Sequence, residues 1–246
     1  MRMWAPCEAR RNIPPMALGP FHVADRIKHA TGIKGIALLM RHGETAWNRE
    51  GRVMGESPVE LDEHGRAQVE LAVPFARAIR PDLIVTSPLI RARQSAEIIS
   101  RGIGAVAVIE DAGLEEVRYG DWQSKVYDDL IDDQAYLEYQ RAPLETQTPG
   151  GESIIEVQKR GVETVRRVMK EREGQRVLFV SHGDIIRTVL AHYLGMELSH
   201  FRRIRVDNAT FSAIDIIGDF AEVKFLNLLA DPARAFVPPF TPRKRK

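Results

Sequence analysis

Two histidines far apart in the chain have matching sequence contexts that suit phosphoryl chemistry. Each follows an apolar run and precedes a glycine, in Arg41-His42-Gly43 and in Ser181-His182-Gly183. A neutral imidazole has a lone pair that can attack phosphorus, and a neighbouring arginine disfavours its protonation. The planar guanidinium of Arg41 can also bind phosphoryl oxygens. Either histidine alone could be an incidental loop or core residue, but two in matching contexts indicate a phosphoryl-transfer site.

The elements expected around these histidines bring them together. Residues 36–40 and 176–180 are apolar runs typical of buried parallel strands. Parallel strands present their carboxyl ends at one edge of a sheet, where open α/β sheets bind ligands, so both histidines can converge on one pocket. A helical pattern over 185–190 places the amide of Gly183 at a helix N-terminus, which favours an anionic oxygen.

A third segment supplies more positive charge. The sequence predicts a short strand over 82–86 and a helix over 89–99, with Pro88 at a position that tolerates proline. Arg91 falls within the first helical turn, beside the strand ends, whereas Arg93 points about 200° around the helix. We therefore expect Arg91 in the site and Arg93 at the surface or in a salt bridge.

A fourth segment offers carboxyl groups. Glu115 and Glu116 follow a strand-like run over 105–109. In a pocket that contains arginines and a phosphoryl group, one carboxyl can act as the general acid for the leaving oxygen. The residue types alone do not distinguish the two glutamates, and either could be a surface carboxylate.

Together these segments resemble the histidine phosphatase superfamily, also called phosphoglycerate-mutase-like. The resemblance covers roughly residues 34–228, and its four blocks occur in the family's order. A single His-Gly pair is a weak signal, whereas four ordered blocks are a strong one. The matching residues are Arg41-His42-Gly43-Glu44-Thr45 with Trp47-Asn48, Ser87-Pro88-Leu89 with Arg91-Ala92 and Gln94-Ser95-Ala96, Leu114 and Glu116 with Tyr119-Gly120-Asp121-Trp122, and Ser181-His182-Gly183.

The resemblance implies a role for each site residue. His42 is expected to become a phosphohistidine, and Glu116, rather than Glu115, occupies the family's proton-donor position. Glu116 would protonate the leaving alkoxide and then activate water. Because positioning and electrostatics stabilise a transferring phosphoryl group, we expect no metal and no cofactor. The residues implied to bind the phosphoryl group or the substrate are Arg41, Arg91, His182, Asn48, Thr45 and the amide of Gly183.

The expected reaction is hydrolysis of a small phosphorylated metabolite. About 65 residues separate Glu116 from His182, whereas phosphoglycerate mutases of this family typically have a longer insertion there that helps to enclose a bisphosphate. A more open pocket would admit water to the phosphoenzyme. Two alternatives stay open: a 2,3-bisphosphoglycerate-dependent phosphoglycerate mutase, and a non-catalytic phosphate-binding or regulatory module. Met54 at a usual glutamine position, and Gln123-Ser124 in place of the common Glu-Gly, leave the substrate undefined.

Composition excludes several other classes of protein. Of the 246 residues, 44% are hydrophobic and 28% are charged, as is ordinary for a soluble protein. The net charge of +1 argues against a general nucleic-acid binder. The single cysteine, Cys7, excludes an internal disulfide framework, and no apolar stretch approaches the roughly 20 residues of a membrane span. We therefore expect a cytoplasmic monomer or homodimer whose partner is a small phosphorylated metabolite.

The chain is expected to comprise three regions. A flexible N-terminal extension covers 1–33, a histidine phosphatase domain 34–230, and a basic tail 231–246. Alternating strand and helix patterns in the domain predict an α/β fold, a three-layer α/β/α sandwich with a mostly parallel central sheet.

Further elements are predicted around this framework. Residues 124–141 are expected to be helical and to cover the pocket, with Tyr127, Tyr136 and Tyr139 as packing residues. Asp62 is expected to cap a helix, and His64 to lie at the surface. A long helix over 152–172 and a closing hairpin over 209–217 and 220–228 complete the prediction.

Overall fold

A mixed six-stranded sheet lies at the centre of the fold. The strands are β1 (Gly35–Arg41), β2 (Leu83–Thr86), β3 (Val108–Glu110), β4 (Arg176–Ser181), β5 (Phe211–Ile217) and β6 (Phe220–Leu228). Their order is β3-β2-β4-β1-β5-β6. The first four strands in that order are parallel, and β5 runs antiparallel to both β1 and β6. The prediction of a mostly parallel sheet with a closing hairpin is confirmed.

The computed structural model describes residues 35–217 and 220–228. The extension predicted over 1–33 and the tail predicted over 231–246 lie outside the described residues, as does the turn at 218–219.

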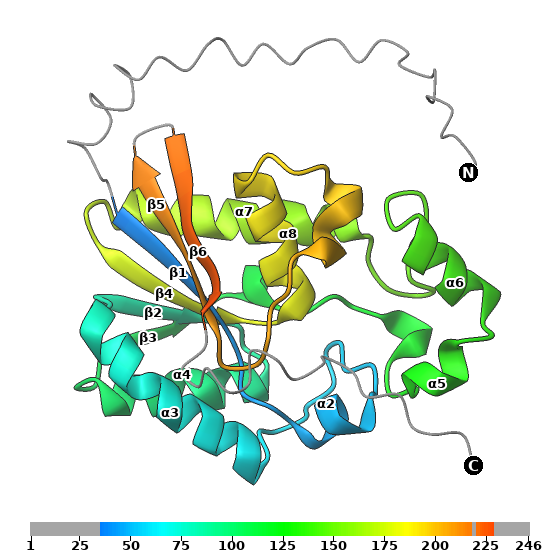
Figure 1. Ribbon diagram of the computed structural model, residues 1–246, viewed down its shortest axis with the longest axis horizontal. Helices are drawn as coiled ribbons and strands as arrows, with labels where there is room; N and C mark the ends of the chain where they lie inside the picture. The colour runs from blue at the N-terminus through cyan, green and yellow to red at the C-terminus, as the bar shows by residue number, and fades with distance from the viewer. Residues whose placement is uncertain (1–34, 218–219, 229–246) are drawn as a thin grey trace, which may run out of the picture.

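Helices cover both faces of the sheet, as Figure 1 shows. On one face lie α3 (Glu63–Ile79) and α4 (Ile90–Gly102), and on the other lie α7 (Ile154–Glu171) and α8 (Gly183–Tyr193). Successive side chains of a strand point to opposite faces. Accordingly, Leu39 belongs to the core beneath α7 and α8, and its neighbour Met40 to the core beneath α3 and α4. The three-layer α/β/α sandwich is confirmed.

The remaining elements are short and lie at one end of the sheet or in the connections. They are the helices α2 (Ala46–Glu50), α5 (Tyr127–Leu130) and α6 (Gln134–Arg141), and the 3₁₀ turns η1 (Ala112–Leu114), η2 (Gly120–Trp122) and η3 (Leu198–Arg203). Figure 1 shows α5 and α6 together at the side of the molecule toward which β1 and β4 end.

The pairing of β1 with β4 fixes the relation between the two histidines. The parallel register places Arg41 opposite Ser181, so His42 and His182 leave neighbouring strands at the same level. The amide of His42 also donates to the carbonyl of Ser181 at 3.0 Å. The expectation that both histidines emerge at one edge of the sheet is therefore confirmed.

Two of the long helices, α3 and α7, begin at a capping side chain. The Asp62 carboxylate accepts from the amide of Gly65 at the start of α3. Ser153 caps α7 in a reciprocal arrangement with Glu156, so this helix begins two residues later than the predicted start at 152.

The prediction of one helical stretch over 124–141 is wrong in its extent. Ser124 has a positive φ of 68°. The segment after it pairs with the loop after α2, through the amide of Ser124 donating to Val53 and the amide of Val53 donating to Lys125. The helix then breaks after α5, and Asp133 caps α6 by accepting from the amide of Tyr136. Tertiary backbone pairing and a second cap therefore divide the segment.

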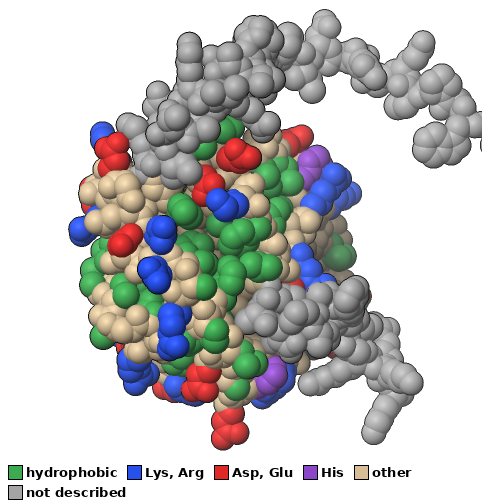
Figure 2. All heavy atoms as spheres, turned by 60° about the vertical axis from the view of Figure 1, so that its left-hand side comes forward, with side chains coloured by type: hydrophobic (Ala, Val, Ile, Leu, Met, Phe, Trp, Pro, Cys, Tyr) green, Lys and Arg blue, Asp and Glu red, His purple; other side chains and the backbone are tan. Residues whose placement is uncertain are grey.

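Charged side chains of both signs are interspersed on the face of the molecule in Figure 2, around a central group of hydrophobic side chains. Within residues 35–217 and 220–228, none of the helices combines the length and the apolar character that a bilayer span requires.

Candidate active site

The ring of His42 is buried and held in one tautomer. Its exposed fraction is 1%. Nδ1 lies 2.6 Å from the carbonyl oxygen of Gly43, and because a carbonyl only accepts, Nδ1 has to carry the proton. Nε2 is then left with its lone pair. The ring centroid of His182 lies 5.1 Å from that of His42, so the two imidazoles line one site.

The loop after β1 is fixed by α3 and α4. Ser95 on α4 accepts from the amide of Gly43 at 3.1 Å and donates to the carbonyl of Arg91 at 2.7 Å. A Cβ atom on Gly43 would collide with the backbone of Gly65, and one on Gly65 would collide with the backbone of Glu44. The two glycines therefore allow the first turn of α3 to press against the loop that presents His42.

Three buried side-chain nitrogen atoms near these rings have no hydrogen-bond partner among the described residues. They are Nε of Arg41, Nε of Arg91 and Nδ1 of His182. They come from the ends of β1 and β4 and from the first turn of α4. Buried donors are rarely left unpaired, because an unpaired donor costs roughly 1–3 kcal/mol. Three of them around one histidine form a cradle suited to the oxygens of an anion.

The two arginines are anchored by backbone carbonyls rather than by carboxylates. Arg91 is fully buried and donates to the carbonyls of Gly55 at 2.7 Å and Ser57 at 3.0 Å. Arg41 donates to the carbonyl of Val206 at 2.9 Å. Carbonyl anchors hold the guanidinium groups in place without neutralising them. Burial lowers the pKa of Arg91 to about 10, so it stays cationic at neutral pH.

Both histidines are kept neutral by their surroundings. Burial lowers the pKa of His42 well below its ordinary value, and the charges of Arg91 and Arg41 add to this effect. Burial and Arg91 act on His182 in the same direction. The sequence predicted the influence of Arg41, and the structure adds burial as the larger cause.

His182 is oriented by the turn before α4. Its Nε2 lies 2.8 Å from Oγ of Ser87, and its Nδ1 is the unpaired atom. His182 also occupies the N-cap position of α8, so Gly183 is the first residue of that helix. Gly183 lies between Nε of Arg41 and the carboxylate of Glu116, each 3.7 Å from the position of an added Cβ.

Glu116, and not Glu115, brings its carboxylate into this cradle. The carboxylate of Glu116 accepts from the amides of Asp184 and Ile185 at the start of α8, at 3.2 and 3.4 Å. Burial and the charge of Asp184 raise the pKa of Glu116, and the charges of Arg91 and Arg41 only partly oppose them. A buried carboxyl whose pKa is raised, beside a cationic cradle, can serve as a proton donor.

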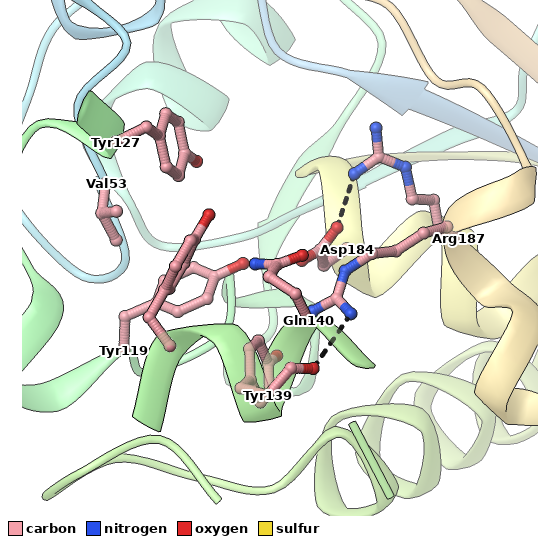
Figure 3. Close-up of a pocket in the computed structure, with 9 residues that line it drawn as sticks. Val53, Tyr119, Tyr127, Tyr139, Gln140, Asp184 and Arg187 are labelled. Carbon is pink, nitrogen blue, oxygen red and sulfur yellow. Dashed lines mark hydrogen bonds and ion pairs between the residues drawn. The ribbon is translucent and has the colours of Figure 1, made fainter. Parts of the chain in front are cut away.

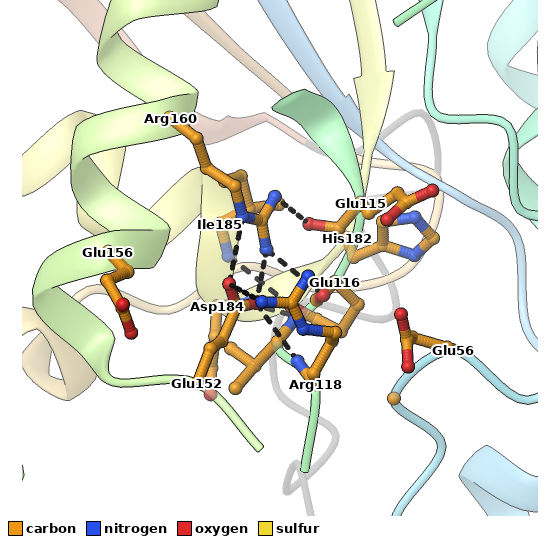
Figure 4. Close-up of polar contacts among 12 residues, drawn as sticks. Glu56, Glu115, Glu116, Arg118, Glu152, Glu156, Arg160, His182, Asp184 and Ile185 are labelled. Carbon is orange, nitrogen blue, oxygen red and sulfur yellow. Dashed lines mark hydrogen bonds and ion pairs between the residues drawn. The ribbon is translucent and has the colours of Figure 1, made fainter. Parts of the chain in front are cut away.

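Arg160 on α7 holds the backbone around the two glutamates, as Figure 4 shows. Its guanidinium donates to the carbonyls of Glu115 at 2.6 Å and Glu116 at 3.1 Å, and to the buried carboxylate of Glu152 at 2.7 Å. The carboxylate of Glu152 in turn accepts from the amide of Arg118 at 3.0 Å. This network fixes the backbone that directs Glu116 toward α8.

Thr45 and Asn48 form the start of α2 close to His42. The side chain of Thr45 caps α2, and the amide oxygen of Asn48 accepts from the Thr45 backbone at 3.1 Å. Asn208 donates to that same oxygen at 3.4 Å and to the carbonyl of His42 at 3.0 Å. Met54 packs its sulfur 3.5 Å from the Thr45 hydroxyl. The oxygen of Asn48 is thus engaged within the protein, and its NH₂ group is the part suited to a ligand.

Arg93 and His64 lie outside the cradle. Arg93 is 44% exposed and lies 3.5 Å from Glu110, as the predicted surface salt bridge. His64 is 54% exposed on α3, as predicted. The part of the chain that the structure describes contains no group of three or more His, Cys, Asp or Glu side chains placed to hold a metal ion.

Sequence reasoning missed several residues that complete the site. Asp184 lies beside Glu116, accepts from the hydroxyl of Tyr119 at 2.6 Å and pairs with Arg187 at 2.6 Å. Burial alone would raise the pKa of Asp184, but Arg187 and Arg202 outweigh it and hold the carboxyl ionised. Asp184 follows the His-Gly block directly, and this adjacency was the one available signal. Asn208, from a loop 160 residues after Asn48, offered none.

Comparisons with known protein sequences agree with this geometry. A sequence model of the histidine phosphatase superfamily (branch 1) matches residues 37–229. The probable phosphoglycerate mutase GpmB of Klebsiella pneumoniae is 34% identical over 179 residues, which are 72% of this chain and 83% of that protein.

Solved structures with the same fold include phosphatases. The mycobacterial glucosyl-3-phosphoglycerate phosphatase, in complex with VO₃, has a TM-score of 0.70 and 27% identity over 78% of this chain and 98% of its own. A variant of the phosphoserine phosphatase of Entamoeba histolytica, in complex with phosphoserine, has a TM-score of 0.71 and 26% identity over 78% of this chain and 96% of its own.

Proposed function

Because this chain belongs to branch 1 of the histidine phosphatase superfamily, we propose that it is a metal-independent phosphomonoesterase that acts through a phosphohistidine on His42. The observation that supports this most strongly is the neutral Nε2 of His42 inside a cradle of unpaired donors from Arg41, Arg91 and His182. The cradle is complementary to a phosphoryl group, and the nucleophile needs no deprotonation before it attacks.

In the first step, Nε2 of His42 attacks phosphorus and the bond from phosphorus to the ester oxygen breaks. Arg41, Arg91 and His182 bind the equatorial oxygens, whose negative charge they stabilise. The NH₂ group of Asn48 and the amide of Gly183 would supply further donors, and Thr45 would position Asn48 through the cap of α2. Glu116 gives its proton to the leaving alkoxide, which departs as an alcohol.

In the second step, the ionised Glu116 takes a proton from water. That water attacks the phosphohistidine, releases inorganic phosphate and leaves Nε2 with its lone pair again. Glu116 is protonated once more, so the site returns to its starting state. One carboxyl thus acts as acid and then as base, and the proton count balances over the cycle.

A phosphoglycerate mutase is the second candidate, supported by the name of the Klebsiella relative. In a mutase, the phosphohistidine returns its phosphoryl group to a phosphoglycerate instead of to water. The connection of about 65 residues between Glu116 and His182, expected to be too short for the enclosing insertion of the dedicated mutases, favours hydrolysis. The solved phosphatases with this fold support the same choice.

One assay distinguishes a phosphatase from a phosphoglycerate mutase. Phosphate release is measured from a panel of metabolite phosphates, in excess chelator and without bisphosphoglycerate. The phosphatase proposal predicts steady release that the chelator does not reduce. Conversion of 3- to 2-phosphoglycerate only after priming with bisphosphoglycerate, without release, would instead identify a mutase. Stoichiometric phosphate binding without either reaction would identify a binding module.

The alkaline limb of the pH profile of kcat/KM is expected to shift when Asp184 is replaced by asparagine. The negative charge of Asp184 raises the pKa of Glu116, which must be protonated to act as the acid. Asp184→Asn removes that charge, so Glu116 loses its proton at a lower pH and the alkaline limb moves to lower pH. His42 must be neutral, and its lowered pKa keeps the acidic limb below pH 6.5 in both proteins.

The measurement is a profile of kcat/KM for an alkyl phosphate over roughly pH 4 to 10. Asp215→Asn is the matched control, because Asp215 pairs with Lys224 on the hairpin β5–β6. If the alkaline limb of Asp184→Asn stays in place or moves to higher pH, the charge of Asp184 does not raise the pKa of the catalytic acid.

A further inference from the structure

A pocket of about 300 Å³ has Asp184 in its wall (Figure 3). Tyr119 and Asp184 form the wall nearest the cradle, because Asp184 bonds to Tyr119 through its side chain and to Glu116 through its amide. The segment that contains α5 and α6 supplies Tyr127, Tyr136, Tyr139 and Gln140, and Arg202 comes from η3. In the proposed reaction Glu116 protonates the leaving oxygen, and Asp184, in the wall of this pocket, is the residue whose amide binds the carboxylate of Glu116.

The tyrosines predicted as packing residues also line this pocket, and one of them has an unpaired hydroxyl. Tyr136 and Tyr139 do pack against Trp122, each with ring centroids 5.4 Å from it. However, the hydroxyl of Tyr139 is buried and has no hydrogen-bond partner among the described residues. Tyr139 is 1% exposed, and a buried hydroxyl rarely lacks a partner. It is an unpaired polar group in the wall of a pocket.

Arg202 supplies further donors in the same pocket. Its guanidinium carbon lies 4.7 Å from the centroids of both the Tyr139 and Phe201 rings. One N–H group donates to the carbonyl of Tyr139 at 3.3 Å, and a guanidinium has five. Arg202 therefore lies over two aromatic rings and lines the pocket, and its hydrogen bond to Tyr139 engages one of its N–H groups. The wall combines aromatic faces with hydroxyl, amide and guanidinium groups.

We propose that this pocket binds a polyhydroxylated ring, so that the substrate is the phosphate ester of a sugar or sugar-like ring. The proposal rests on the phosphatase function above and names its class of substrate. Aromatic faces pack against the apolar C–H face of such a ring, and its hydroxyls can pair with Tyr139, Gln140 and Arg202. The volume lies at the lower end of the range of about 300–1,000 Å³ for small-molecule sites, which suits one ring.

Other leaving groups fit this wall less well. A plain aryl or cycloalkyl group would fill the space but leave the Tyr139 hydroxyl unpaired and buried, and a site built to pair with a hydroxyl rejects analogues without one. A short acyclic group such as serine or glycerate would leave much of the pocket unfilled. It would also leave the tyrosine rings of the α5–α6 segment without a ligand to pack against.

The test compares primary phosphate esters that differ only in the group to be bound. Glucose 6-phosphate and ribose 5-phosphate present hydroxylated rings, cyclohexylmethyl phosphate presents a ring without hydroxyls, and O-phosphoserine presents an acyclic group. We expect kcat/KM for at least one sugar phosphate to exceed that for the other two esters by about 10-fold or more. Equal values, or a preference for O-phosphoserine, would overturn the proposal.

Variants show whether the preference arises in this pocket. Tyr139→Phe is expected to reduce kcat/KM for the sugar phosphate by about 10-fold more than for cyclohexylmethyl phosphate. Gln140→Ala, at an exposed position where folding is not at risk, is expected to reduce kcat/KM for the sugar phosphate by about 3-fold more than for cyclohexylmethyl phosphate. Tyr193→Phe, on α8 and outside the pocket lining, is the matched control. Equal losses on both esters in Tyr139→Phe and Gln140→Ala would contradict the proposal.

Failure of the phosphatase proposal can be distinguished from failure of this one. If the wild type releases no phosphate from any ester, dissociation constants are measured by calorimetry with the His42→Ala protein. Tighter binding of the sugar phosphates, weakened by Tyr139→Phe, would retain the pocket assignment without the reaction. Equal binding of all the esters would overturn the pocket assignment as well.

Discussion

His42→Ala is expected to lower phosphate release by about 10,000-fold or more and to abolish the phosphoenzyme. The reason is that Nε2 of His42 is the atom that forms the bond to phosphorus, and alanine provides no replacement. The cradle of Arg41, Arg91 and His182 stays in place, so substrate binding is expected to persist. The measurement is rapid quenching after mixing with a ³²P-labelled ester, followed by acid-labile, base-stable label on the protein.

His64→Ala is the matched control for this experiment. His64 lies exposed on α3, outside the cradle, so its removal should change neither turnover nor labelling. Persistent labelling of His42→Ala would mean that another group is the nucleophile. The neighbouring imidazole of His182, with its ring centroid 5.1 Å away, would then be the next residue to replace.

Glu116→Gln is expected to separate substrates by the quality of their leaving groups. Glutamine keeps the shape and accepts from the amides of α8, but it has no proton to give. Alkyl phosphates, whose alkoxide needs that proton, should lose about 100- to 10,000-fold in kcat/KM. p-Nitrophenyl phosphate, whose phenolate leaves without help, should lose much less in formation of the phosphoenzyme. Burst kinetics with the two esters measure this difference.

Hydrolysis of the phosphoenzyme gives the second half of that test. Because Glu116 also activates water in the proposed cycle, the variant should form a burst of p-nitrophenol and then turn over slowly. Glu115→Gln is the control, since Glu115 lies one position away and sends its carbonyl, not its carboxylate, into the Arg160 network. Normal turnover of an alkyl phosphate by Glu116→Gln would exclude Glu116 as the proton donor.

The framework of the site could be predicted because it depends on local patterns. Apolar runs that end in His-Gly define two strands, and the parallel rule then places both histidines at one edge. The first-turn position of Arg91 followed from helical periodicity in the same way. Glu116 could be separated from Glu115 only through the family resemblance, because the difference depends on the start of α8 and on Arg160.

What could not be predicted depends on contacts between distant segments. Tyr139 and Arg202 come into contact only because α6 and η3 lie side by side. Asn208 reaches His42 from the other end of the domain. The late start of α5 was missed because the pairing of Ser124 with Val53 overrides helix propensity. None of these contacts can be predicted from a local sequence pattern, because each joins segments that are far apart in the chain.

The position of β1 in the sheet has a consequence for how the chain is made. β1 is the first strand in the described chain, yet its two neighbours, β4 and β5, both lie beyond residue 175. At roughly 5–20 residues per second, a ribosome needs on the order of 10 s after completing β1 to deliver β4. Throughout that interval the apolar strand that presents His42 has no partner on either side. A chain whose synthesis stops before β4 therefore leaves this apolar strand unpaired and lacks His182, so it cannot form the anion cradle.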